Sequence, residues 1–192
     1  MPRDYATLTL SKLAATARLA ELAPPARVGL DDPAIAVMTD LREYRAATIT
    51  PDRKIDEAHA VMLGRGVRLL FVLDDNRAVA GVVTLTDLLG ERPMHFMQER
   101  GLTRGDVLVG DMMTPAAELE AVAISAVKGM RVGHIVATLK AVRRQHVLAS
   151  DDGGQSICGV FSTQRIARQL GVDLETIGVA RSFAEIEAAL AR

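Results

Sequence analysis

The chain has 192 residues, a formal net charge of −1 at pH 7 and a sequence pI of about 6.4. Apolar residues make up 49% of it and charged residues 24%, which is typical of a soluble globular protein with a sizeable core and gives no bulk attraction to nucleic acid or to an anionic membrane surface. The single cysteine excludes an internal disulfide and a thiolate metal cluster, and it indicates a reducing compartment.

The sequence shows none of the common signals of an enzyme, a metal site or a membrane span. His59, His95, His134 and His146 do not have the spacing of a metal-binding or catalytic motif. No pair of carboxylates at acid–base spacing and no nucleophile beside a base is found. No apolar stretch reaches the roughly 18 residues of a membrane span, and the N-terminus lacks a secretory pattern. We therefore predict a cytoplasmic protein with no catalytic cofactor, no metal and no nucleic-acid or membrane partner.

Residues 1–36 are predicted to form an N-terminal arm. Residues 11–22 are rich in Ala and Leu with charged residues between them, which is typical of a helix. Pro24 and Pro25 cannot continue that helix. Its apolar positions are expected to face either the body of this chain or a second copy.

Residues 37–100 are predicted to form a small α/β unit made of a strand, a helix, a two-stranded hairpin and a second helix. These elements are expected at residues 48–49, 55–63, 69–73 with 79–83, and from 86 onward. Residues 93–100 extend the second helix in this prediction, and the glycines at 101 and 105 end it.

The same pattern recurs at residues 112–172, after a linker at residues 101–111. The Met38-Thr39 pair recurs 75 residues later as Met113-Thr114, and Gly81 recurs 78 residues later as Gly159. A unit of about 60 residues is small for a stable core. Two copies packed face to face through their sheets are therefore predicted.

Residues 173–192 are predicted to form a C-terminal helix. Ser182 and Glu185 have the spacing of a capping box, and Phe183, Ile186 and Leu190 recur at helical spacing. This helix has one apolar stripe that must be buried. With the N-terminal arm, it is the candidate surface for a homodimer.

The stretch from Gly81 to Asp87 ends a predicted strand and begins a predicted helix. Thr84 and Asp87 have the spacing of a capping box, in which each side chain pairs with a backbone N–H of the first helical turn. The same atoms suit a nucleotide, because the helix start and a hydroxyl favour a phosphate. A carboxylate can accept both hydroxyls of a ribose. Spacing alone leaves both interpretations open.

The repeat arrangement, the Met-Thr pair before each unit, the GVVTLTD stretch at residues 81–87 and the VGDMMTP stretch at residues 109–115 resemble a tandem pair of cystathionine-β-synthase (CBS) domains, a Bateman module. The resemblance covers about residues 37–172. It implies an α/β fold of two β-α-β-β-α repeats, with a cleft between them that binds an adenosyl ligand. In such modules the state of the ligand is passed to an attached or separate effector.

The resemblance implies a role for several residues of the first repeat. Thr84 corresponds to the hydroxyl near the phosphate, and Asp87 to the carboxylate on the ribose. Thr48 and Ile49 match the strand that contacts adenine through its backbone. Arg68 lies where these modules sometimes place a basic phosphate contact, or else it is a solvated charge.

The second repeat departs from this pattern. Ser162 keeps the hydroxyl, but Arg165 replaces the carboxylate. Either this second cleft is empty, or Arg165 meets the phosphates of a ligand held mainly by the first repeat, which the basic residues of the second repeat favour. Phe161 in place of Val83 is expected to crowd the second cleft.

The sequence therefore predicts a sensor that binds AMP, ADP, ATP or a similar adenosyl compound and signals through an effector protein or through self-association. The alternative is a homodimeric scaffold whose cleft is vacant or closed by side chains.

Overall fold

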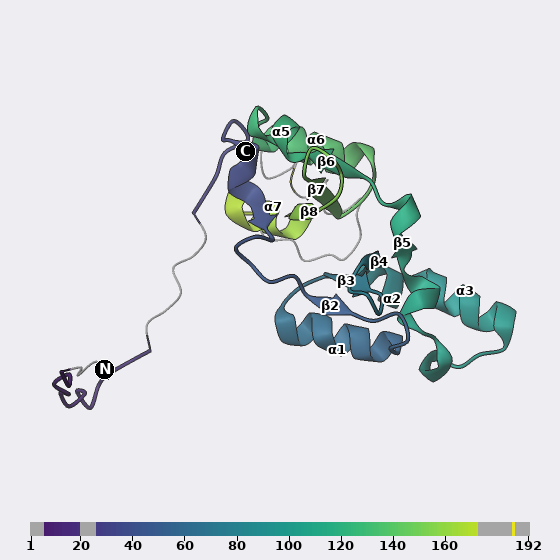
Figure 1. The fold of residues 1–192 in the computed structure, drawn as a ribbon, viewed down its shortest axis with the longest axis horizontal. Helices are drawn as coiled ribbons and strands as arrows, with labels where there is room; N and C mark the ends of the chain where they lie inside the picture. The colour runs from purple at the N-terminus through teal and green to yellow at the C-terminus, as the bar shows by residue number, and fades with distance from the viewer. Residues whose placement is uncertain (1–5, 20–25, 173–185, 187–192) are drawn as a thin grey trace, which may run out of the picture.

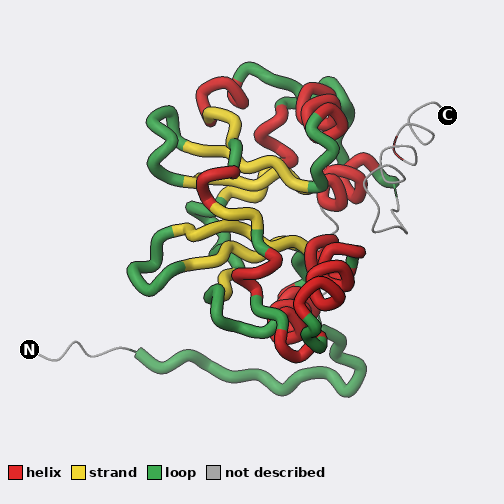
Figure 2. The backbone as a smooth tube through the Cα atoms, turned by 90° about the vertical axis from the view of Figure 1, so that its right-hand side faces the viewer, coloured by secondary structure: helices red, strands yellow, loops and turns green. Residues whose placement is uncertain are grey.

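The computed structural model describes residues 6–19, 26–172 and 186, and it has four layers. Two four-stranded sheets face each other in the middle, and helices cover their outer sides (Figure 1). Figure 2 shows the strands of both sheets stacked beside one another, with the helices set to one side of them. The predicted α/β fold of two repeats packed through their sheets is confirmed.

The first sheet has the strand order β2-β3-β4-β5. These strands are Thr48–Ile49, Leu69–Leu73, Val79–Thr84 and Thr114–Pro115. β2 runs parallel to β3, whereas β3 and β4 form the predicted antiparallel hairpin. The apolar run of β3 fills both faces of the sheet, because one face meets helices and the other meets the second sheet.

Three helices accompany the first sheet: α1 (Ile55–Arg65), α2 (Leu85–Leu89) and α3 (Glu91–Arg100). α1 ends at Gly66 and α3 at Gly101, both in the left-handed conformation that glycine adopts without strain. The prediction that residues 93–100 extend the second helix is wrong. The chain becomes extended at Gly90, so α3 is a separate helix.

The second sheet has the order β1-β8-β7-β6. Its strands are Met38–Asp40, Ile157–Ser162, His146–Ser150 and Ala121–Ala123. Its helices are α5 (Ile124–Lys128), α6 (Val132–Ala141) and α7 (Thr163–Leu170).

Each sheet takes its edge strand from the stretch that precedes the other repeat. β1 precedes the first repeat in sequence but pairs with β8, and β5 precedes the second repeat but pairs with β4. The short helices before these strands, η1 (Ala34–Val37) and α4 (Val109–Met112), cross over with them. A division of the chain at residue 37 or 112 therefore separates strands that are paired in one sheet.

The crossover is built in the same way on both sides. Val109 N and Gly110 N donate to the carbonyls of Arg53 and Pro51 at 2.8 and 2.9 Å. On the other side, the N–H groups of residues 132 and 133 donate to the carbonyls of residues 32 and 30 at 2.9 Å each. A pseudo-two-fold relation between the repeats follows from these matched bonds.

Three apolar clusters form the core. One belongs to the first sheet and α1, one to the second sheet and α6, and the third joins the two sheets. The third cluster consists of Leu69, Phe71, Val82, Leu148 and Val160. Because it lies between the sheets, it holds the repeats together as the sequence predicts.

The linker at residues 101–111 packs on the first repeat. It contains the 3₁₀ turn Arg104–Asp106, and a second such turn, Ala116–Glu118, follows β5. The Arg104 guanidinium lies 2.8 Å from Asp56 Oδ1 and donates to the Leu88 carbonyl at 3.3 Å. Val107 is fully buried, and its carbonyl accepts from Ile55 N at 3.2 Å. The linker therefore ties α1 to α2.

The predicted helix at residues 11–22 is wrong for its described part. Residues 11–19 form turns and extended chain, and the leucines of the arm at positions 8, 10, 13 and 19 are 87–95% exposed. An Ala- and Leu-rich helix of about a dozen residues is marginal in water without a packing partner. The predicted C-terminal helix lies outside the described residues except for Ile186, which is helical and buried in the second core.

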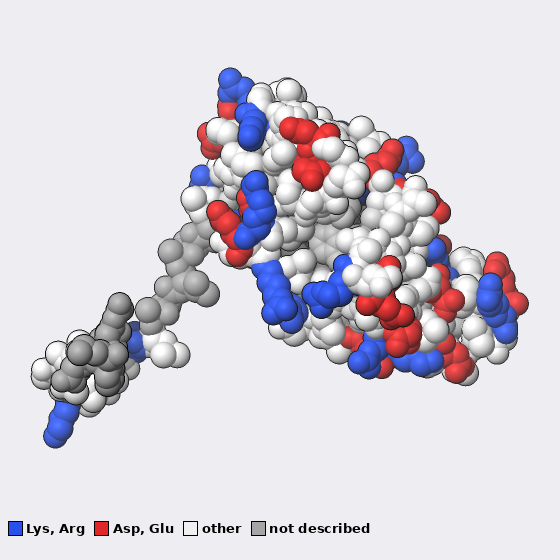
Figure 3. All heavy atoms as spheres, in the orientation of Figure 1, with Lys and Arg blue, Asp and Glu red and all other residues white. Residues whose placement is uncertain are grey.

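Two searches of the described residues bear on function. No helix among them is both long and apolar enough to cross a membrane. No group of three or more His, Cys, Asp and Glu side chains among them is placed to hold a metal ion. Figure 3 shows acidic and basic side chains interspersed over the visible face.

The crossover gives a prediction about two equivalent glycines. A Cβ on Gly81 would overlap the Thr114 backbone carbonyl, whereas a Cβ on Gly159 would meet the flexible thioether of Met38. Gly81→Ala should therefore lower the free energy of unfolding by about 1–3 kcal/mol, and Gly159→Ala by less. Urea denaturation measures both.

Gly64→Ala is the matched control for the two glycines. Gly64 lies on α1 with no atom near its would-be Cβ, so alanine should stabilise the protein by up to about 1 kcal/mol. Equal effects at positions 81 and 159 would contradict the difference between a rigid and a flexible neighbour.

Candidate functional site

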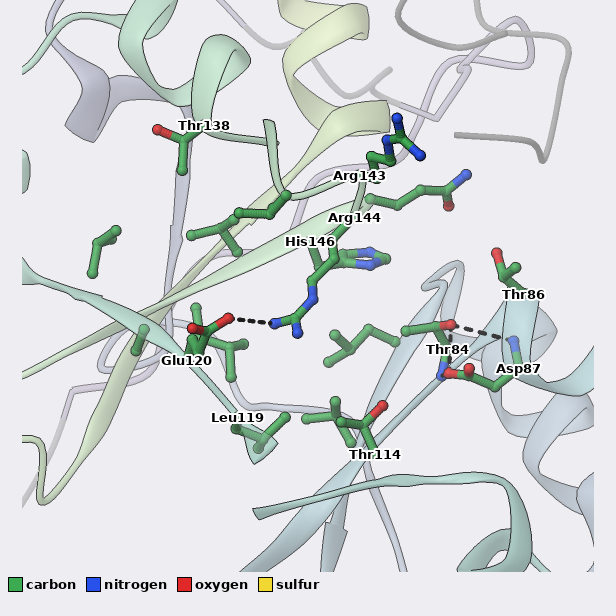
Figure 4. Close-up of a pocket in the computed structure, with 18 residues that line it drawn as sticks. Thr84, Thr86, Asp87, Thr114, Leu119, Glu120, Thr138, Arg143, Arg144 and His146 are labelled. Atoms are coloured by element: carbon green, nitrogen blue, oxygen red, sulfur yellow. Dashed lines mark hydrogen bonds and ion pairs between the residues drawn. The ribbon is translucent and has the colours of Figure 1, made fainter. Parts of the chain in front are cut away.

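A cavity of about 380 Å³ lies between the two repeats (Figure 4). Its lining comes from β3, β4 and the start of α2 on one side, and from β6, the end of α6 and β7 on the other. The lining residues are Leu69, Val82, Thr84, Thr86, Asp87, Thr114, Leu119, Glu120, Ala121, Val122, Thr138, Val142, Arg143, Arg144, Gln145, His146, Val147 and Leu148. The site thus needs both repeats.

Thr84 and Asp87 form the predicted capping box at one end of the cavity. Asp87 Oδ2 accepts from Thr84 N at 2.8 Å and from Thr84 Oγ1 at 2.7 Å. Asp87 N in turn donates to Thr84 Oγ1 at 3.4 Å. The hydroxyl proton of Thr84 therefore points at Asp87 and is not a free donor for a phosphate.

The second oxygen of Asp87 is differently placed. Oδ1 lies 3.7 Å from Arg92 Nη1, which is an ion-pair distance but too long for a hydrogen bond, and the Asp87 side chain is 20% exposed. Asp87 therefore serves the helix with one oxygen and retains the other for a ligand. The capping and ligand interpretations of this motif are compatible.

Cations reach the cavity from the opposite repeat. Arg143 and Arg144 follow α6 directly, and Arg144 Nη1 lies 3.5 Å from Glu120 Oε2. Figure 4 shows this ion pair on the side of the cavity away from Asp87. Because Arg144 and Glu120 are both well exposed, an anionic ligand can compete with Glu120 for the arginine.

Arg143 has an unfavourable backbone conformation. Its φ is 52°, in the left-handed region, where the first repeat has Gly66 at 63°. The bonds around the two residues match: Gly66 N donates to Leu63 O at 3.2 Å, and Arg143 N donates to Lys140 O at 3.2 Å. A side chain in this conformation costs about 1–2 kcal/mol relative to the right-handed region. The strained arginine lines the cavity.

His146 begins β7 and also lines the cavity. Its Nδ1 is enclosed and has no hydrogen-bond partner among the described residues. Burial, together with the nearby Arg68 cation, lowers the pKa of His146 to about 4. The ring is therefore neutral at physiological pH.

The sequence analysis predicted seven site residues, and two of them, Thr84 and Asp87, line this cavity. The other five lie elsewhere: Thr48 and Ile49 on β2, Arg68 before β3, and Ser162 and Arg165 at the start of α7. Arg165 Nε is enclosed without a partner within the described part of the chain. Arg165 is not among the cations that face Asp87.

The pseudo-symmetry explains which residues the sequence analysis missed. Thr48 pairs with Phe71 in the first sheet just as Ala121 pairs with Leu148 in the second. The strand that faces Thr84 and Asp87 is therefore β6 of the second repeat. Applying the repeat offset to residues 48 and 49 would have identified Ala121 and Val122.

Phe161 does not crowd a cleft as the sequence analysis expected. Its side chain is fully buried in the core of the second repeat, as Val83 is in the core of the first. Both residues point to the helical side of their sheets, away from the cluster between the sheets.

Comparison with known proteins identifies the fold. Residues 34–93 match the family model of the CBS domain. An uncharacterized protein of Methanopyrus kandleri is 31% identical over 62 residues, and this match spans 32% of each chain. The chain thus matches about a third of the length of this curated relative.

Solved structures match over more of the chain. An uncharacterized conserved protein of Pyrococcus horikoshii has a TM-score of 0.56 at 22% identity, covering 78% of this chain and 99% of that one. CBSX2 of Arabidopsis thaliana in complex with AMP has a TM-score of 0.50 at 21% identity, covering 71% and 94%. A CBS-domain containing protein of Agrobacterium tumefaciens has a TM-score of 0.51 at 18% identity, covering 67% and 88%. These likenesses show the tandem CBS fold.

The strain at Arg143 can be tested by substitution. Arg143→Gly should raise the free energy of unfolding by about 1 kcal/mol, because glycine accepts the left-handed conformation. Arg143→Ala should give no such gain, because alanine keeps a Cβ in the same conformation. Urea denaturation of both variants measures the difference, and equal stabilities would contradict the strain.

Proposed function

We propose, from the CBS domain at residues 34–93 and the tandem CBS fold, that this chain is a regulatory module that binds an adenosyl ligand such as AMP, ADP or ATP in the cavity between its repeats. One observation carries the proposal: a single cavity joins Asp87 of the first repeat to Arg143 and Arg144 of the second. This arrangement offers a carboxylate to a sugar and cations to a phosphate. The module is proposed to act by binding, without catalysis.

Each part of such a ligand has a partner in the proposal. Oδ1 of Asp87 accepts from the ribose hydroxyls. The apolar wall around Val122 and Leu148 covers the adenine, and the backbone of β6 reads its edge. Arg143 and Arg144 bind the phosphates, with Arg144 released from Glu120. α2 has only five residues, so its dipole contributes little.

A thermal-shift panel of adenosine, AMP, ADP and ATP tests the proposal. A ligand at about 100 times its dissociation constant should stabilise the protein by about 2.7 kcal/mol. Asp87→Ala should lower the Tm without ligand, because it removes the cap, and should also abolish the shift caused by the ligand.

The chain supplies a matched control for the loss of a cap. Thr103 and Asp106 form the same capping box outside the cavity, with Thr103 N donating to Asp106 Oδ2 at 2.9 Å. Asp106→Ala should lower the Tm similarly and keep the ligand shift. If no compound shifts the wild-type Tm, or if Asp87→Ala responds as wild type does, the ligand-independent scaffold is the better account.

The phosphate part of the proposal has its own test. Arg143→Ala should weaken AMP binding by isothermal titration calorimetry and leave adenosine binding unchanged, because adenosine carries no phosphate. A loss of equal size for both compounds would show that Arg143 does not bind the phosphate.

Output through self-association is also part of the proposal. Leu63, Leu89 and Met94 are 69, 43 and 51% exposed on α1, α2 and α3, and they offer apolar surface to a second copy. Light scattering at micromolar concentration should give about twice the 20.6 kDa of one chain. A monomer mass with and without AMP would leave a separate effector protein as the route of output.

A further inference from the structure

His146 occupies a central place in the cavity wall. Its ring extends from β7 toward Thr84 and Thr86 of the first repeat, below Arg143 (Figure 4). The equivalent position at the start of β3 is Leu69, which is buried in the cluster between the sheets. The second repeat thus places a polar ring where the first has an apolar side chain.

The two ring nitrogens of His146 differ in their surroundings. Nδ1 is enclosed, and no group in the described part of the chain hydrogen-bonds to it. A proton on Nδ1 would be a buried donor without an acceptor, which is unfavourable. The neutral ring therefore carries its proton on Nε2, at the outer end of the side chain.

The charges around the ring favour the neutral form. Arg68 approaches from the start of β3, and its cation together with burial lowers the pKa of His146 to about 4. Across the cavity, Arg143 and Arg144 are offset by Asp87 and Glu120. Protonation would also place a second N–H on the enclosed Nδ1, where no acceptor waits.

We infer that His146 is a specificity-determining residue of the cavity, a neutral donor whose Nε2–H bonds to an acceptor atom of the adenosyl ligand. This inference rests on the proposed function. Because a neutral donor needs no proton from solvent, its contribution is the same over the physiological pH range. His146 thereby differs from the arginines, which select for charge.

Three variants test the inference by calorimetric titration with AMP at pH 7.5. His146→Leu removes the donor and should weaken binding about 3- to 10-fold. His146→Gln places an amide donor near the position of Nε2 and should stay within about 2-fold of wild type. His95→Leu changes an exposed histidine of α3 outside the cavity and should bind as wild type does.

The stability of the protein without ligand separates binding from structure. His146→Leu replaces an unpaired enclosed nitrogen with carbon, so its Tm should equal or exceed that of wild type. Between about pH 4 and 6.5 the unfolded histidine binds a proton that the folded one does not, so wild type loses stability as pH falls through this window. His146→Leu should lose less over the same range.

The outcomes are distinguishable. If wild type binds AMP and His146→Leu binds it equally well, the inference is overturned and the proposed function stands. The inference is also overturned if AMP binding takes up a proton in wild type but not in His146→Gln, measured in buffers of different ionisation enthalpy. If wild type does not bind AMP, the proposed AMP site fails and the role of His146 fails with it.

Discussion

The exchange of edge strands between the repeats is the constraint on which the rest of the structure depends. β1 completes the second sheet and β5 completes the first, so backbone hydrogen bonds hold each repeat to the segment that leads into the other. The apolar cluster between the sheets adds packing to this connection. A cavity wall made from two repeats keeps its geometry only because these bonds fix their relative position.

The pair is symmetric in its backbone and asymmetric in its chemistry. Matched positions carry Gly66 and Arg143 after the first helix of each repeat, Leu69 and His146 at the start of the hairpin, and Asp87 and Arg165 in the second helix. Within the cavity, the carboxylate therefore comes from one repeat and the cations and the imidazole from the other. The strain at Arg143 and the unpaired nitrogen of His146 both lie at this cavity, where proteins commonly sacrifice stability for function.

Local sequence patterns predicted local structure well. The apolar run Leu69–Leu73 became β3, and the Thr84–Asp87 spacing became a capping box, because both depend on neighbours in sequence. The strand exchange was missed, since β1 and β5 are two or three residues long and their partners lie more than 30 residues away. The same omission misplaced the strand facing Asp87, and no pattern within residues 143–146 reveals that the fold turns them toward the first repeat.

The crossover has a consequence for how this chain assembles. Either half, separated from the other, would keep a hairpin whose outer edge lacks the strand that closes it. Such an edge can be closed equally well by the corresponding segment of another molecule, since the hydrogen bonds formed are the same. Two chains that trade halves would then rebuild every sheet and both shared walls, with the connection between the repeats as the hinge of a domain-swapped pair.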